Sequence, residues 1–126
     1  MFDNKEAHFG GDYFFEKADF GGKEVVSEVF ELGQTNGGLR VRGWVDGTAT
    51  ATSGKTITVK LEAGDDPSGG DFEIIAQNVI TAEGTSMNGD IFSYIPDTAK
   101  KYMRVKVTPD TGITGKFSVA PEYIPR

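Results

Sequence analysis

Residues 56–62 read Thr-Ile-Thr-Val-Lys-Leu-Glu, and apolar and polar side chains alternate along them without a break. Successive side chains of a β-strand point to opposite faces, so a strict period of two predicts a strand with one buried face. Ile57, Val59 and Leu61 are expected to face the core, while Lys60 and Glu62 face outward with the threonines. This stretch is the clearest strand in the chain and favours a β-protein.

The same period appears in residues 39–45 and again in 102–107. In the first of these runs, Arg40, Arg42 and Trp44 lie on the face opposite the apolar residues. In the second run, the apolar residues are expected to face the core and the basic residues to meet solvent or a partner. Both runs are therefore predicted to be half-buried strands.

Three further runs, 25–32, 72–81 and 90–95, are rich in β-branched and aromatic residues but alternate less cleanly, and 117–119 continues the pattern after a turn. They are too short for helices of ten or more residues, so we also predict strands there. Glycine, asparagine, aspartate and proline separate the runs, as turns require, at residues 34–38, 46–47, 64–70, 88–90 and 108–112. About seven strands at this spacing predict a sandwich, a jelly roll or a small barrel.

The first 24 residues differ from the rest of the chain because they show neither period. They contain Tyr13 and five of the nine phenylalanines, namely Phe2, Phe9, Phe14, Phe15 and Phe20. A disordered tail is poor in aromatic residues, so residues 1–24 are expected to form an arm that packs on something, next to a sandwich domain over 25–126. The arm covers its own sandwich, or it reaches a neighbouring subunit or another protein through aromatic anchors.

Composition narrows the functional classes. The chain has 126 residues, which suits one domain, and it has no cysteine and one histidine, His8. Disulfides, thiolate metal sites and cysteine nucleophiles are thereby excluded, and we expect no cofactor and no enzyme activity. The net charge of −6 argues against binding nucleic acid. The polar start of the chain and the lack of a long apolar run predict a protein made in the cytoplasm that does not contact a membrane.

Two motifs that suggest ligands are weak. Residues 53–56 read Ser-Gly-Lys-Thr like the end of a phosphate-binding loop, but position 49 is alanine where that motif needs glycine, and a strand follows. The carboxylates of Asp65, Asp66 and Asp71 are of the kind that binds calcium, yet they lack the spacing of a known calcium loop. An ordinary solvated turn is the alternative for this loop.

Trp44 raises the possibility of a carbohydrate platform, because aromatic faces stack on sugars. It shares a strand face with Arg40 and Arg42. That face is either an exposed aromatic flanked by arginines or the second core face of a strand that is buried on both sides.

The strand and turn residues also resemble a known family. Segments 27–33 (Ser-Glu-Val-Phe-Glu-Leu-Gly), 37–41 (Gly-Gly-Leu-Arg-Val), 95–105 (Ile-Pro-Asp-Thr-Ala-Lys-Lys-Tyr-Met-Arg-Val) and 112–119 (Gly-Ile-Thr-Gly-Lys-Phe-Ser-Val) are similar to the small capsid cement, or decoration, proteins of tailed bacteriophages. The likeness spans roughly residues 25 to 120 and includes no catalytic signature. The N-terminal arm of this chain is longer and richer in phenylalanine than the family pattern.

The resemblance implies a jelly-roll domain, often a small homo-oligomer (dimer or trimer), that binds the outer surface of the head shell and clamps neighbouring major capsid protein subunits. The expected fold is thus an all-β, jelly-roll-like antiparallel sandwich of about seven or eight strands with an N-terminal arm. Our hypothesis assigns the shell or subunit contact to the arm and to two basic residues: Phe2, Phe9, Tyr13, Phe14, Phe15, Phe20, Arg104 and Lys106. Removing residues 1–20 is then expected to abolish shell retention without unfolding the sandwich. The alternative is a carbohydrate- or receptor-binding sandwich that uses Trp44.

Overall fold

The computed structural model describes residues 13–31, 39–82, 86–95 and 100–123, and these contain β-strands and no helix. In chain order the strands are β1 (Phe15–Asp19), β2 (Val25–Val26), β3 (Phe30–Glu31), β4 (Leu39–Thr50), β5 (Thr56–Gly64), β6 (Glu73–Thr81), β7 (Ser86–Tyr94), β8 (Tyr102–Pro109) and β9 (Thr114–Tyr123). The described residues include no helix that could span a membrane. Phe2 and Phe9 lie outside the described residues.

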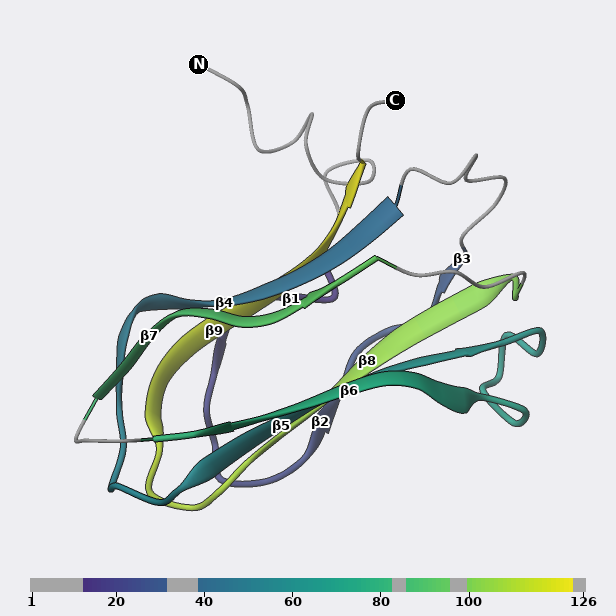
Figure 1. Ribbon diagram of the computed structural model, residues 1–126. Helices are drawn as coiled ribbons and strands as arrows, with labels where there is room; N and C mark the ends of the chain where they lie inside the picture. Colours follow the sequence, from purple (N-terminus) through teal and green to yellow (C-terminus); the bar gives the residue numbers. More distant parts are fainter. Residues whose placement is uncertain (1–12, 32–38, 83–85, 96–99, 124–126) are drawn as a thin grey trace.

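The strands form two antiparallel sheets that lie face to face (Figure 1). One sheet has the order β1-β9-β4-β7 and is called the β4 sheet here. The other has the order β2-β8-β5-β6, with β3 also on β8, and is called the β5 sheet. Because β2 and β3 pair with the same strand, they act as one interrupted strand. The pairings β1 with β9, β2/β3 with β8, β4 with β7 and β5 with β6 are nested in the chain, which is the connectivity of a jelly roll.

The core lies between the sheets and consists of the side chains that the alternation predicted. Ile57, Val59 and Leu61 of β5 are fully buried, and so are the apolar residues of the neighbouring strand β8, Met103, Val105 and Val107. Burying each such side chain contributes roughly 1.5–3 kcal/mol relative to leaving it in water. The predicted all-β, jelly-roll-like sandwich is confirmed.

The described part of the predicted arm belongs to this core. β1 pairs antiparallel with β9, and the side chains that flank it, Phe14 and Phe20, are only 6% and 5% exposed. Phe14 stacks on Phe30 at 4.3 Å between ring centroids, and Phe20 stacks on Phe117 at 4.7 Å. Residues 13–24 of the predicted arm therefore pack on their own sandwich and not on a neighbouring subunit.

The structure corrects the predicted strand at 25–32. It is split into β2 and β3, because three residues lie between Val26 and Phe30 but only two lie between their partners Lys106 and Met103 on β8. Ser27 fills the irregular stretch: its N–H donates to the Val105 carbonyl at 2.9 Å, and its hydroxyl accepts the Val105 N–H at 2.8 Å. A serine hydroxyl thus replaces a main-chain partner, which is how short polar side chains interrupt regular ladders.

Two predicted turns are kinks inside long strands. Gly47 and Gly89 have positive φ angles of 80° and 78°, but β4 and β7 continue through them. Between the pairs Trp44↔Asp90 and Thr48↔Asn88 the two strands advance by different numbers of residues, which marks a bulge. The two glycines supply the positive φ that turn residues favour, but here this conformation bends the sheet and does not reverse the chain.

Candidate functional site

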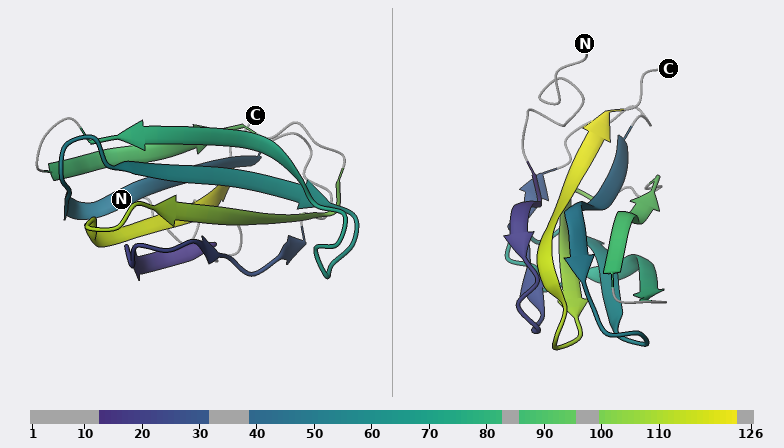
Figure 2. Two further views of the ribbon diagram at one scale, coloured as in Figure 1. Left: turned by 90° about the horizontal axis from the view of Figure 1, so that it is seen from below. Right: turned by 90° about the vertical axis from the view of Figure 1, so that its left-hand side faces the viewer.

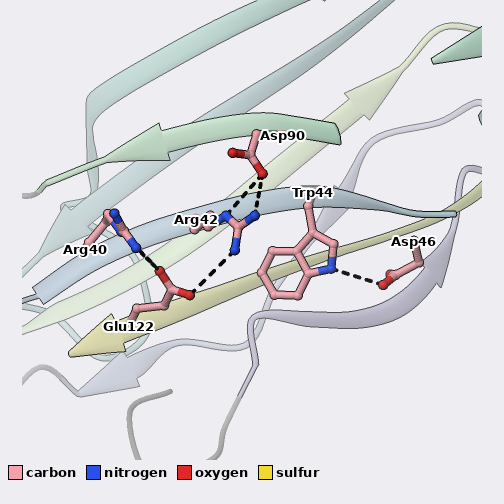
Figure 3. A network of polar contacts seen from close by, with 6 residues as sticks. All are labelled: Arg40, Arg42, Trp44, Asp46, Asp90 and Glu122. Carbon is pink, nitrogen blue, oxygen red and sulfur yellow. Dashed lines mark hydrogen bonds and ion pairs between the residues drawn. The ribbon is translucent and has the colours of Figure 1, made fainter. Parts of the chain in front are cut away.

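The outer face of the β4 sheet carries a cluster of polar and aromatic side chains that contact one another. β4 runs between β9 and β7, and its alternation turns Arg40, Arg42 and Trp44 outward, as predicted. Asp46 of β4 and residues of the neighbouring strands β7 and β9 complete the cluster, and Figure 3 shows how most of its members point toward one another. We call this surface the β4 face and define it as Arg40, Arg42, Trp44, Asp46, Asp90, Ser118 and Glu122.

Charged side chains on the β4 face form a ladder across three strands. The Arg40 Nη2 lies 2.6 Å from the Glu122 Oε1 on β9, and the Arg42 Nη2 lies 2.7 Å from the Asp90 Oδ1 on β7. The Nε of each arginine donates to the same carboxylate oxygen as its Nη2, at 3.1 Å. Arg42 also approaches the second oxygen of Glu122 at 3.9 Å. Two donors on each carboxylate fix the planes of both guanidinium groups.

Trp44 is half-buried beside this ladder, and its ring is held from several sides. The indole Nε1 donates to the Asp46 Oδ1 at 3.1 Å. The Arg42 guanidinium carbon lies 5.2 Å from the ring centroid, which is a cation–π contact. Tyr13 meets the ring edge-on at 6.3 Å between centroids. Trp44 is therefore an outward aromatic flanked by arginines, and it is not part of a second core face.

Asp46 is the group that anchors Trp44 to β9. Its Oδ2 accepts the Ser118 hydroxyl at 2.5 Å, and that hydroxyl in turn accepts the main-chain N–H of Lys17 on β1 at 3.0 Å. Burial raises the pKa of the Tyr13 phenol, and the carboxylates of Glu16 and Asp46 raise it further. Tyr13 is thus neutral at physiological pH, and the edge of the β4 face is tied together from three strands.

The residues proposed for partner contact fall in different places. Tyr13 lies beside Trp44 on the β4 face, whereas Phe15 is half-buried and packs against Phe117 at 5.2 Å. Phe14 and Phe20 are inside the core. The assignment of these two phenylalanines to a partner interface is therefore corrected, because burial in their own domain leaves almost no surface for a partner.

Arg104 and Lys106 lie on the opposite side of the molecule, on the outer face of the β5 sheet. They face outward as predicted, but both are paired with Glu62, whose side chain is 8% exposed. Arg104 contacts one oxygen of Glu62 at 2.8 Å and Lys106 the other at 3.4 Å. The Arg104 guanidinium also lies over the Phe72 ring at 4.6 Å. One carboxylate thus balances one of the two positive charges of this pair within the chain.

The acidic loop at 64–72 is organised by its own carboxylates. Asp71 accepts the main-chain N–H groups of Asp65 and Asp66, each at 3.0 Å, and these hydrogen bonds lower its pKa. Asp66 accepts the N–H and the hydroxyl of Ser68. In the described residues no three acidic or histidine side chains come together in a way that could hold a metal ion. The contacts support the reading of this loop as a turn.

Sequence reasoning missed Asp46, Asp90, Ser118 and Glu122. Only Asp46 carries a local signal, because it follows Trp44 by two residues and so shares its strand face. The other three reach the β4 face through the register of β7 and β9 on β4, which depends on bulges that one sequence does not locate.

No protein-family profile matches the chain, and no curated protein matches it. Among solved structures, the chain is similar to a CBM4 carbohydrate-binding module (TM-score 0.47, 16% identity), covering 79% of this chain and 61% of that chain. It is also similar to a chain of infectious bursal disease virus Gx strain (TM-score 0.43, 11% identity, 87% and 29% coverage) and to TmCBM61 in complex with β-1,4-galactotriose (0.36, 17%, 79% and 60%). This chain thus spans about three fifths of each carbohydrate-binding module chain and less of the viral one. At these TM-scores and identities the likenesses assign no function.

Proposed function

We propose that this chain is a non-enzymatic decoration, or cement, protein that binds the outer surface of a bacteriophage head shell. In this role it stabilises contacts between major capsid protein subunits, after being made in the host cytoplasm. The resemblance of the strand and turn segments supports the shell as the partner. The observation that carries the binding surface is the β4 face, where Trp44 and two arginines are locked in place by carboxylates of three strands.

The chemistry of the β4 face suits a protein partner. Tryptophan, tyrosine and arginine dominate the binding energy of protein interfaces, and single hot-spot residues contribute about 2 kcal/mol or more. Arg40 and Arg42 keep side-chain exposures of 40% and 39%, so their outer edges remain accessible. Since the ion pairs already fix these side chains, binding orders little that was free before. A partner therefore meets a preformed surface.

A carbohydrate- or receptor-binding module is the second candidate, favoured by the outward position of Trp44 beside hydrogen-bonding arginines and carboxylates. The contacts of the Trp44 ring favour a protein partner over a carbohydrate ligand. The Arg42 guanidinium lies over the indole, and the Tyr13 ring meets its edge. These contacts use part of the aromatic surface on which a sugar ring would stack.

Phe2 and Phe9 keep their proposed role as additional shell contacts. Tyr13, the first residue that the structure describes, contacts Trp44 on the β4 face. Removing residues 1–12 tests this role and spares Phe14 and Phe20, which the core needs. The expected result is weaker shell binding by a protein that remains folded.

Binding of purified protein to undecorated head shells tests the assignment of the β4 face. Trp44→Ala is expected to weaken shell binding by about 30-fold, which corresponds to about 2 kcal/mol. Lys60→Ala, on the outer face of the other sheet, is the matched control and should bind like the wild type. Thermal melting verifies that both variants are folded. Unchanged shell binding by folded Trp44→Ala refutes this surface, and glycan-array binding that Trp44→Ala abolishes would establish the second candidate.

A further inference from the structure

Among the strands that the structure describes, one sheet edge contains a regular, uncharged stretch to which another strand can pair. The two sheets have four edges, formed by β1, β7, β2/β3 and β6. An edge strand presents a row of backbone N–H and C=O groups that another strand can pair with. Proteins protect such edges with charged side chains, bulges or short, interrupted strands.

Three of the edges have these protective features. β1 carries Glu16, Lys17 and Asp19, and its register on β9 is irregular, with a φ of 50° at Lys17. β7 contains Asp90 and is kinked at Gly89, where its pairing with β4 shifts. β2 and β3 are two residues long each. None of these edges offers a long, regular template.

β6 is the exception, and Figure 2 shows it at one edge of the β5 sheet. It is nine residues long, and no charged residue occurs from Ile74 to Thr81. An extra residue near Ile75 interrupts its pairing with β5, but Ala76–Thr81 pairs with β5 residue by residue. On the outer face of the sheet, Ile74 and Val79 are each 51% exposed.

The position of β6 is also fixed from the side of the other sheet. Asn78 lies opposite the buried Val59, and its side-chain amide donates to the Ile91 carbonyl of β7 at 3.0 Å. This hydrogen bond joins the edges of the two sheets at the middle of Ala76–Thr81.

We propose that β6 pairs antiparallel with β6 of a second copy of this chain, which joins the two β5 sheets into one continuous sheet. Each copy carries a net charge of −6, so the copies repel each other over their whole surfaces, and a contact strand without charges adds no further repulsion at short range. Ala76–Thr81 is such a strand. An antiparallel pair of identical strands has two-fold symmetry and therefore satisfies both edges equally. This inference does not depend on the shell as a partner.

The pleat limits how the two strands can align. Paired residues of an antiparallel sheet lie on the same face, so a shift by one residue is excluded. Gln77, Val79 and Thr81 are on the outer face, because they pair with the outward residues of β5. Val79 of one copy therefore faces Gln77, Val79 or Thr81 of the second copy.

Sedimentation of the purified protein without shells tests the proposal. The wild type is expected to be a dimer at about 100 μM, a concentration well above a micromolar Kd. Val79→Lys should be a folded monomer, because it brings like charges together at the pairing strand. Val26→Lys is the matched control: Val26 is 47% exposed on the opposite edge of the same sheet, and this variant should stay dimeric.

Cysteine cross-linking gives a second measurement that does not rely on a destabilised interface. The chain has no native cysteine, so a disulfide between the copies reports this contact alone. The variants are Val79→Cys by itself, Val79→Cys mixed with Gln77→Cys, and Val79→Cys mixed with Thr81→Cys. One of the three is expected to cross-link readily, whereas Val26→Cys should not. A monomeric wild type, equal loss of dimer in Val26→Lys, or no cross-link overturns the proposal. If the wild type is a monomer and Val79→Lys loses shell binding, a strand of a shell protein pairs with β6 instead of a second copy.

Discussion

Replacing Phe20 with alanine tests whether the aromatic N-terminal segment is part of the core. Phe20 is 5% exposed, its ring stacks on Phe117 at 4.7 Å, and its N–H donates to the Gly115 carbonyl at 3.0 Å. Phenylalanine-to-alanine substitutions in cores cost about 3–5 kcal/mol. Because Phe20 sits at the margin of the sandwich, we expect the lower end, about 3 kcal/mol, out of a typical total of 5–15 kcal/mol.

Urea unfolding followed by tryptophan fluorescence measures this change. Trp44 is the single tryptophan of the chain and contacts Tyr13, so its emission reports on the sandwich and on the N-terminal segment together. The midpoint for Phe20→Ala should fall while the slope stays constant. Glu16→Ala, an exposed change on β1, is the control and should lie within about 0.5 kcal/mol of the wild type. A loss below about 1 kcal/mol for Phe20→Ala would contradict the assignment of this segment to the core.

Three further predictions concern the loops and the outer face of the β5 sheet. Hydrogen bonds from the N–H and the hydroxyl of Thr56 lower the pKa of Asp110 from 3.8. The stability that the ionised Asp110 contributes is complete above pH 3.8 and is lost as the pH falls through the folded-state pKa. In Asp110→Asn, the free energy of unfolding should therefore depend less on pH in this range. Glu62→Gln leaves two cations without their buried counter-charge and should lower the unfolding free energy by about 2 kcal/mol, and adding Arg104→Met should restore part of it. Gly69 has a φ of 86°, and a Cβ added there would displace the Arg104 guanidinium from Glu62 and Phe72. Gly69→Ala should therefore cost about 1–2 kcal/mol, more than Gly54→Ala, where φ is 91° but nothing lies within 4 Å; equal melting temperatures for the two alanine variants would contradict this loss of contacts.

The regular strands could be predicted from the sequence because each carries its own signal. The strict alternation of residues 56–62 and 102–107 predicted both strands and the buried sets that include Val59 and Val105. Alternation reports burial on one face, which is a local property of a strand. The jelly-roll-like sandwich followed from the number and spacing of such strands together with the family resemblance.

The placement of the N-terminal aromatic residues could not be decided in the same way. The burial of Phe14 depends on Phe30, and the burial of Phe20 depends on Phe117, far along the chain. A stretch of five residues with three charges lacks an alternation signal, although β1 forms there. Removal of residues 1–20 is therefore expected to unfold the sandwich, in contrast to the expectation from sequence.

The candidate site shows the same division between local and long-range information. Arg40, Arg42 and Trp44 could be placed on one face because they alternate along a single strand. Their partners Asp90 and Glu122 depend on pairing with β7 and β9, where bulges shift the register. A one-residue difference in register turns a side chain to the other face, so the ion-pair ladder needed the structure.

Co-sedimentation of the protein with undecorated phage head shells tests whether it is a decoration protein that binds through the β4 face. We expect saturable binding at a fixed ratio to the major capsid protein. Decorated shells should also resist heating better, because a ligand that binds only the assembled state stabilises it. Arg42→Ala combined with Trp44→Ala should abolish this binding in a folded protein. Failure of the wild type to sediment with the shells, or full binding by the folded double variant, would show that the protein does not bind shells through this face.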